Sequence, residues 1–274
     1  GGGPLRARLP APAAIALLAG VYAGFGRLGW DIPHASALAE LHGPLLLCGL
    51  FGTLVSLERA VAIGRGWAYA APALSGVGTL VLLAGAPVPA AAGVYALAAA
   101  VLVGGSLVIT MLQPALFTGT LLFGALAWLA GNLLWAMGSP IVDVVGWWLT
   151  FLILTIAAER LELSRLRAPK RGSEALFLFA LGMLLAGAQN GITTRNGSTL
   201  FGIALLVMMG WLLRHDIAWA NLRRTGQARF MAICMVAGYA WLGAAGLALM
   251  GFPPGASPFS YDIALHAILT GFVF

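Results

Sequence analysis

The feature that most constrains this chain is a succession of apolar runs, each about as long as a membrane is thick. An α-helix rises about 1.5 Å per residue, so about 20 apolar residues span the roughly 30 Å hydrocarbon core of a bilayer. The chain is 61% hydrophobic and 9% charged. We therefore predict an all-α, polytopic transmembrane helix bundle forming a single domain over residues 1–274. Glycine, proline and charged residues divide it into ten predicted helices, at residues 10–28, 38–63, 67–85, 88–112, 114–137, 140–163, 174–189, 198–213, 228–250 and 259–274.

The basic residues divide the loops between these runs into two sets. Cytoplasmic loops of membrane proteins hold an excess of Lys and Arg. With a cytoplasmic N-terminus, 13 of the 15 Lys and Arg residues fall in inner segments. Only Arg27 and Arg195 then lie on the outer side. The net charge of +6 is thus explained by orientation in a lipid bilayer, and we expect no nucleic-acid partner.

Two histidines lie inside predicted helices, where an ionisable side chain usually has a function. The helices 38–63 and 259–274 both run from the outer side inward. His42 is about the fifth residue of the first and His266 about the eighth of the second, a difference in depth of only about 5 Å. Two imidazoles at similar depth on parallel helices can bind one metal centre from opposite sides.

We predict that this centre is a b-type haem. Imidazole is a common axial haem ligand, and the haem propionates need cationic partners near the membrane surface. Arg27 and Arg195 lie at that level. Asp262, one helical turn before His266, is placed to accept the ring N–H and to fix the tautomer of the ring. The alternative is that the histidines only cap or cross-link helices, with Arg27 meeting lipid phosphate.

A stripe of small residues follows the first of these histidines. In a regular α-helix, Gly49, Thr53, Ser56 and Ala60 return to the face of His42. Such a stripe leaves room either for a flat ligand or for a closely packed helix, and small faces are common where membrane helices meet. We include Gly49 and Thr53 among the candidate cofactor-binding residues.

Other polar residues give weaker signals. His34 lies in the first outer loop and His215 in an inner loop, and we expect both to be solvated. Asn132 lies deepest within a predicted helix, where one hydrogen bond between helices explains it. The sequence contains no G-x-S-x-G, Walker-type or HExxH motif. No catalytic residue is assigned, and any enzymatic activity would be a redox reaction.

Three stretches of the sequence resemble the NnrS family. They are ELHGPLLLCGLFGTLVSLERAVAIG at 40–64, IAAERLELSR at 156–165 and LHAILTGFVF at 265–274. Members of this family are bacterial membrane proteins associated with haem and copper and with the response to nitric oxide during denitrification. The resemblance implies the bacterial inner (cytoplasmic) membrane and a role in the nitric oxide response or in electron transfer. It also implies other membrane subunits or a periplasmic electron donor as partners. Copper has no visible ligand set, and His34 is the spare outer histidine.

The predicted architecture is also similar to that of the catalytic subunit of haem-copper oxidases. That subunit has twelve helices in three arcs of four, and its second and tenth helices ligate a low-spin haem. His42 and His266 match these two ligands. Ala264 replaces the ligand of the active-site haem, and the helix 140–163 contains no histidine for copper. The resemblance therefore implies one low-spin haem without oxidase-type catalysis. Because the last run is still apolar at Phe274, we expect further helices after it. The resemblance to the oxidase subunit then implies twelve in full.

A functional alternative belongs to another class. The same scaffold without a cofactor would suit an accessory subunit, or a transporter of small molecules or metals. A transporter is expected to show a buried charge or a broken helix near the middle of the membrane. Haem analysis of the purified protein would separate these alternatives.

Overall fold

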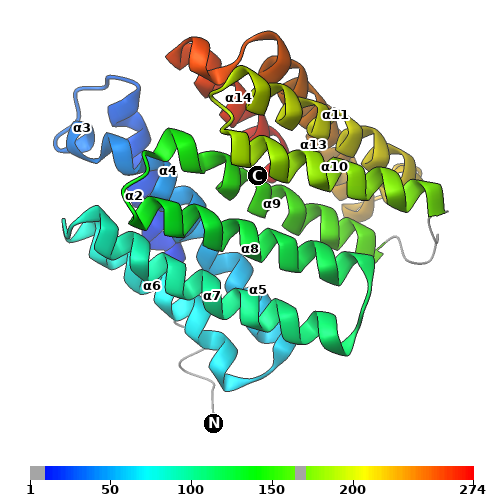
Figure 1. Ribbon diagram of the computed structural model, residues 1–274, viewed down its shortest axis with the longest axis horizontal. Coiled ribbons are helices and arrows are strands. Elements are labelled where there is room, and N and C mark those ends of the chain that lie inside the picture. Colours follow the sequence, from blue (N-terminus) through cyan, green and yellow to red (C-terminus); the bar gives the residue numbers. More distant parts are fainter. Residues whose placement is uncertain (1–9, 164–170) are drawn as a thin grey trace. The chain divides into compact units, whose positions relative to one another are not determined.

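A computed structural model describes residues 10–163 and 171–274, and all regular elements in these ranges are helices (Figure 1). The chain divides into two compact units. The first consists of Gly1–Pro114 and Trp128–Ile141, and the second of Ala115–Ala127 and Val142–Phe274. The helix α8 (Leu116–Ala136) contributes residues to both units. The single domain over residues 1–274 stays a prediction.

Within the described ranges, eight helices are long and apolar enough to cross a membrane. They are Ala35–Ile63, Gly66–Leu83, Val88–Leu112, Leu116–Ala136, Ile141–Leu163, Gly172–Asn190, Arg195–His215 and Gln227–Gly251. The first and last predicted runs also form helices, Ala11–Arg27 and Pro258–Ile268, which are shorter. The all-helical, membrane-type fold is thus confirmed. Ten spans and an oxidase-like arrangement stay predictions.

The first unit packs through small residues. Its elements are α2 (Ala11–Arg27), α3 (Ala35–Leu38), η1 (Ala39–Leu41), α4 (His42–Pro44), η2 (Leu45–Phe51), α5 (Gly52–Ile63), η3 (Gly66–Tyr69), α6 (Ala70–Leu83), α7 (Val88–Leu112) and the end of α8. α6 packs along α7, α5 packs on both, and α2 packs on η2. At Gly78 of α6, an added Cβ would lie 3.0 Å from the Tyr95 ring of α7. The missing side chain therefore lets these two helices approach closely.

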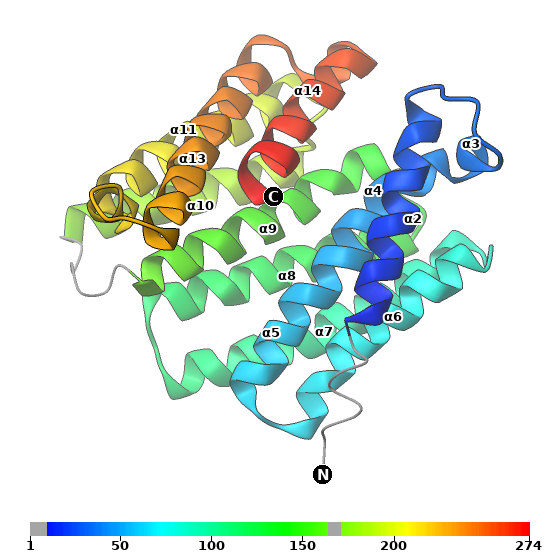
Figure 2. The ribbon, with the colours of Figure 1, turned by 180° about the vertical axis from the view of Figure 1, so that it is seen from behind.

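The second unit is a series of neighbouring helices (Figure 2). It contains the start of α8 and the elements α9 (Ile141–Leu163), α10 (Arg171–Asn190), α11 (Arg195–His215), α12 (Ala218–Asn221), α13 (Gln227–Gly251), η5 (Pro254–Ala256), α14 (Pro258–Ile268) and η6 (Leu269–Val273). α10 packs on α11, α11 on α13, and α13 on α14 and η6. At Gly187, an added Cβ would lie 2.7 Å from the Phe201 nitrogen. Glycines again set the distance between these helices.

Large apolar side chains are exposed along the helices of both units. Leu18 is 72% exposed in the first unit, and Trp241 is 53% exposed in the second. Water rarely contacts extensive apolar surface of this kind, whereas lipid tails do. These side chains are consistent with a protein embedded in a lipid bilayer.

Candidate functional site

His42 begins α4, and its ring packs on α2. The ring nitrogen Nδ1 lies 2.8 Å from the carbonyl oxygen of Gly20. A carbonyl oxygen can only accept, so Nδ1 carries a proton, and in the neutral ring the lone pair is then on Nε2. Gly24, one turn further along α2, makes room for the ring, because an added Cβ there would lie 2.9 Å from Nδ1. Two glycines of α2 therefore determine the tautomer and the position of this imidazole.

The helix that follows His42 is π-helical from Leu45 to Phe51. π-Helical segments are rare and frequently occur at functional sites. Pro44, directly before the segment, has no main-chain N–H. Inside the segment, the Cys48 carbonyl accepts a hydrogen bond of 2.9 Å from Ser75 Oγ on α6. Because a π-helix has more residues per turn than an α-helix, regular α-helical spacing does not predict which residues share the face of His42.

Gly49 and Thr53 lie in contacts between helices. A Cβ at Gly49 would lie 2.8 Å from Thr79 Oγ1 and 2.9 Å from Ala16 Cβ. The Thr53 hydroxyl donates to Ser75 Oγ at 3.0 Å. These contacts show that Gly49 and Thr53 allow neighbouring helices to pack closely, which is the second of the two explanations for the stripe of small residues. We therefore place neither Gly49 nor Thr53 among the haem-contacting residues proposed below.

A buried hydrogen-bond network surrounds the π-helical segment η2. Asn132 of α8 accepts a hydrogen bond from Cys48 Sγ at 3.3 Å and donates to the Tyr95 carbonyl at 3.4 Å. The Tyr95 hydroxyl lies 2.9 Å from Thr79 Oγ1. The predicted hydrogen bond of Asn132 between helices is confirmed. No sequence pattern indicated Thr79, because hydroxyl side chains are common in apolar helices and most bond to their own helix.

His266 lies on α14, and its side chain is exposed. Its Nδ1 lies 2.8 Å from the main-chain carbonyl oxygen of Asp262, so this nitrogen also donates. The His266 ring N–H thus donates to Asp262, the predicted residue, but to its main-chain carbonyl and not to its carboxylate. Thr270 Oγ1 donates to the His266 carbonyl at 2.5 Å. A second π-helical segment, Leu269–Val273, begins three residues after His266.

The two histidines therefore share a local arrangement. In each, Nδ1 donates to a main-chain carbonyl, which orients the ring and leaves Nε2 as the nitrogen able to bind a metal. In each, a π-helical segment begins three residues later. His42 belongs to the first unit and His266 to the second. That both bind the same iron stays a prediction from the sequence.

Each predicted propionate partner lies at the end of a helix. Arg27 is the last residue of α2 and lies one turn after Gly24, which contacts the first histidine. Arg195 is the first residue of α11. The loop that leads into α14 packs beside this helix end, since a Cβ at Gly255 would overlap the Thr193 carbonyl oxygen. Both arginine side chains are exposed and can reach an anionic group.

The two remaining histidines differ in their surroundings. His34 is exposed, as predicted, and has a left-handed φ of 61°. The prediction that His215 is solvated was wrong. Its ring is half-buried, its Nε2 lies 2.8 Å from Ser173 Oγ, and it stacks on Trp211 with ring centroids 4.6 Å apart. The start of α10 packs there against the end of α11, a contact that no local sequence pattern indicates.

Asp216, directly after α11, is a buried carboxylate that the sequence analysis did not single out. Its side chain is 3% exposed. Oδ2 accepts a hydrogen bond of 2.7 Å from the Tyr239 hydroxyl, and Oδ1 accepts one of 2.6 Å from the Ala218 N–H. The carboxylate therefore joins α13 to the turn after α11. A buried acid next to several arginines is hard to predict when its partner lies on another helix.

No group of three or more His, Cys, Asp or Glu side chains that could hold a metal ion occurs in residues 10–163 and 171–274. The ligand set of the expected copper is therefore not identified in these ranges. A haem iron needs fewer protein ligands, because the macrocycle supplies the equatorial ones and the protein supplies the axial ones. Single, well-oriented histidines are sufficient for that purpose.

A family model described as a domain of unknown function (DUF8744) matches residues 6–274. No curated protein and no solved structure matches the chain. The matched region includes both histidines and both arginines described above.

Proposed function

The chain belongs to the family described as a domain of unknown function (DUF8744). For this chain we propose that it is a membrane protein that binds b-type haem through His42 and His266. The observation that supports this most directly is the 2.8 Å hydrogen bond from Nδ1 of each ring to a main-chain carbonyl. This bond leaves the lone pair on Nε2, which is the state that an axial haem ligand requires.

The surroundings of the histidines also suit a haem ligand. The His42 ring donates a hydrogen bond to the Gly20 carbonyl and occupies the space that Gly24, which has no side chain, leaves beside α2. It is therefore oriented before any cofactor binds, which lowers the entropy lost on ligation. His266 lies at an exposed position of α14. Arg27 lies one turn from the contact with His42 and can neutralise a propionate.

When bound, a haem with two imidazole ligands supplies one-electron transfer. The protein's own part is to orient the two rings, to present Nε2 of each neutral ring to the iron, and to place Arg27 and Arg195 near anionic groups. With the resemblance to the NnrS family, this favours a role in the nitric oxide response or in electron transfer in the bacterial inner membrane. The partner would be another membrane subunit or a periplasmic electron donor.

The proposal is tested by measuring haem in the purified, detergent-solubilised protein. We expect a Soret band and one haem per chain. His42→Ala and His266→Ala should each remove the low-spin spectrum, because each loses an axial ligand. His34→Ala is the matched control, since it replaces an exposed histidine on the predicted outer side, and it should leave the spectrum unchanged.

Several outcomes would contradict the proposal. A missing Soret band would favour the cofactor-free alternative, an accessory subunit or a transporter. A spectrum that is unchanged in His42→Ala or in His266→Ala would remove that histidine as a ligand. If both imidazoles occupy the same iron, carbon monoxide should leave the reduced spectrum unchanged. A prompt shift would show an open axial position and contradict bis-histidine ligation.

A further inference from the structure

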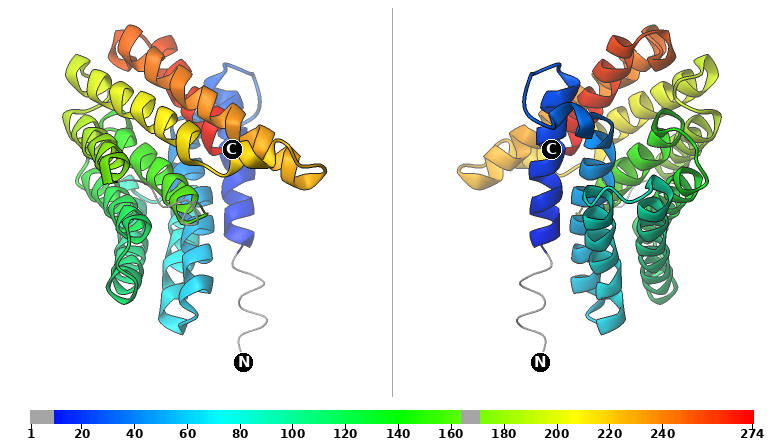
Figure 3. Two further views of the ribbon diagram at one scale, coloured as in Figure 1. Left: turned by 90° about the vertical axis from the view of Figure 1, so that its right-hand side faces the viewer. Right: turned by 90° about the vertical axis from the view of Figure 1, so that its left-hand side faces the viewer.

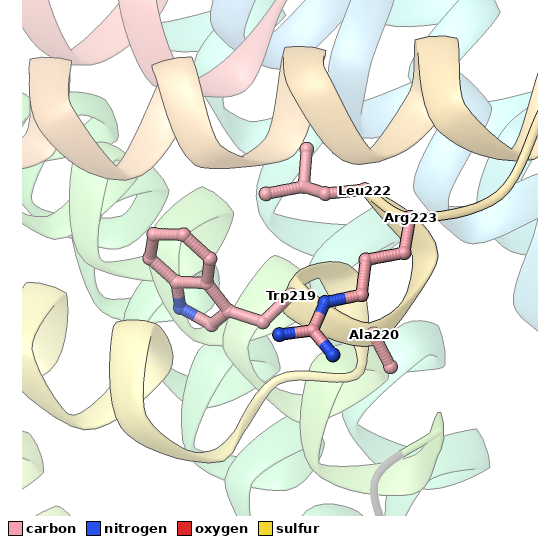
Figure 4. Close-up of a pocket in the computed structure, with 4 residues that line it drawn as sticks. All are labelled: Trp219, Ala220, Leu222 and Arg223. Carbon is pink, nitrogen blue, oxygen red and sulfur yellow. The ribbon is translucent and has the colours of Figure 1, made fainter.

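The turn between α11 and α13, in the second unit, forms a cavity that the haem proposal does not use. The short helix α12 lies in this turn, in the golden segment between the end of α11 and the start of α13 (Figure 3). The cavity has a volume of about 660 Å³ and is lined by Trp219, Ala220, Leu222 and Arg223 (Figure 4). It therefore combines an aromatic ring, two aliphatic side chains and a guanidinium group.

The polar side-chain groups of this cavity are all hydrogen-bond donors. The Trp219 indole donates through Nε1–H and cannot accept. The Arg223 guanidinium has five N–H groups and no acceptor, and it extends toward the Trp219 side chain (Figure 4). A molecule that pairs with both must bring acceptor oxygens, and negative charge is favoured.

The charged side chains of the segment that forms the cavity are all basic. Arg223, Arg224 and Arg229 lie in or just after the turn, and residues 217–261 contain no Asp or Glu. The preceding acid, Asp216, already bonds through both oxygens, to Tyr239 and to a main-chain N–H. The segment therefore attracts anions.

Apolar surface adjoins the basic residues. Leu222 lines the cavity, and the first turns of α13 expose Phe230, Met231 and Ile233. Arginine and tryptophan are common at the depth of the lipid headgroups, where the long arginine stem lies on apolar surface and its charge faces the headgroups. An amphiphile with an anionic head matches this combination better than a free anion, which would leave the apolar side chains unused.

We propose that the cavity binds the headgroup of an anionic phospholipid. The phosphate accepts hydrogen bonds from Arg223 and Trp219, and the acyl chains lie along the exposed start of α13. This site depends on the membrane location of the chain and is independent of haem binding.

The test compares lipids of identical acyl chains on the purified, detergent-solubilised protein by native mass spectrometry. Phosphatidylglycerol should bind several-fold more tightly than phosphatidylcholine. Arg223→Gln should weaken phosphatidylglycerol binding about fivefold, the effect of one basic residue near an anionic membrane surface, and should weaken phosphatidylcholine binding less, because that headgroup has no net charge. Trp219→Phe, which keeps the ring and removes the N–H, should give a smaller loss of the same kind.

Arg65→Gln is the matched control, because Arg65 is also exposed and lies on the same predicted side of the membrane. It should bind phosphatidylglycerol like the parent. Equal affinity for the two lipids, or an equal loss in both arginine variants, would overturn the proposal. Displacement of phosphatidylglycerol by inorganic phosphate would overturn it as well, because the site would then be a free-anion site. Since Arg223 is exposed, its variant should keep the melting temperature of the parent.

Discussion

At the scale of single residues, two glycines of α2 explain how His42 is held. Gly20 supplies the carbonyl that bonds to Nδ1, and Gly24 leaves the space that the ring occupies. A glycine inside a helix costs roughly 0.5–1 kcal/mol relative to alanine. At Gly24 this cost allows an imidazole to be oriented against the helix backbone, which alanine would prevent.

Gly24→Ala should therefore displace the His42 ring. The added Cβ would lie 2.9 Å from Nδ1 and 3.0 Å from Cε1, so the hydrogen bond to Gly20 should break. Overpacking of this kind costs about 1–3 kcal/mol. We expect a lower melting temperature together with a weakened low-spin haem spectrum, measured by thermal unfolding and absorbance on the same preparation.

The control for this substitution is Gly104→Ala on α7, where an added Cβ meets nothing within 4 Å. There the change should be neutral or stabilising by up to about 1 kcal/mol, because alanine favours a helix. If Gly24→Ala behaves like Gly104→Ala in both measurements, the contact between α2 and His42 does not orient the ring.

At the scale of helices, the change from α-helical to π-helical geometry after each histidine is the unusual feature. A π-helical segment shifts the pairing of main-chain groups, so side chains of neighbouring helices can satisfy a carbonyl. Ser75 of α6 satisfies a carbonyl of η2 in this way, because its hydroxyl donates to the Cys48 carbonyl and accepts from Thr53. One hydroxyl on α6 thus connects the π-helical segment to the α-helix that continues it.

Ser75→Ala should destabilise the first unit, because it removes both of these buried hydrogen bonds. Interhelical hydrogen bonds in membrane proteins average about 0.6 kcal/mol each, so we expect a loss of about 1 kcal/mol, seen as a lower midpoint of thermal or denaturant unfolding. Ser106→Ala is the control, since Ser106 is also a buried serine, on α7, and the hydrogen bond that it accepts from Thr110 uses its main-chain carbonyl, which the substitution keeps. Equal midpoints for the two variants would mean that Ser75 does not stabilise η2.

The helices were predictable from the sequence to different degrees. The predicted run 88–112 coincides with α7, because the length and apolarity of a run largely determine a membrane helix. The run 38–63 was predicted as one regular helix, yet it includes the 3-10 turn η1 and the π-helical segment η2. In the latter, the Cys48 carbonyl is hydrogen-bonded by Ser75, a partner on another helix. For the same reason, the hydrogen bond between His215 and Ser173 could not be predicted from local spacing.

At the scale of the whole chain, the distribution of basic residues predicts the direction of every helix. Arg195 begins α11 on the predicted outer side, and Arg214 lies near its other end, on the predicted inner side. The orientation of α11 therefore decides the side on which the α12 cavity lies. It also decides whether Arg195 faces the periplasm, where a propionate partner is needed.

Cysteine labelling tests this orientation. Asn196 and Thr225 are both exposed and lie on either side of α11. Single cysteines at these positions are introduced with Cys234→Ala, since Cys234 is exposed, while the buried Cys48 is retained. An impermeant maleimide added to intact cells should label Asn196→Cys, and it should label Thr225→Cys only after permeabilisation, because a spanning helix separates the two positions. The reverse pattern would invert the orientation, and labelling of both from one side would show that α11 does not cross the membrane.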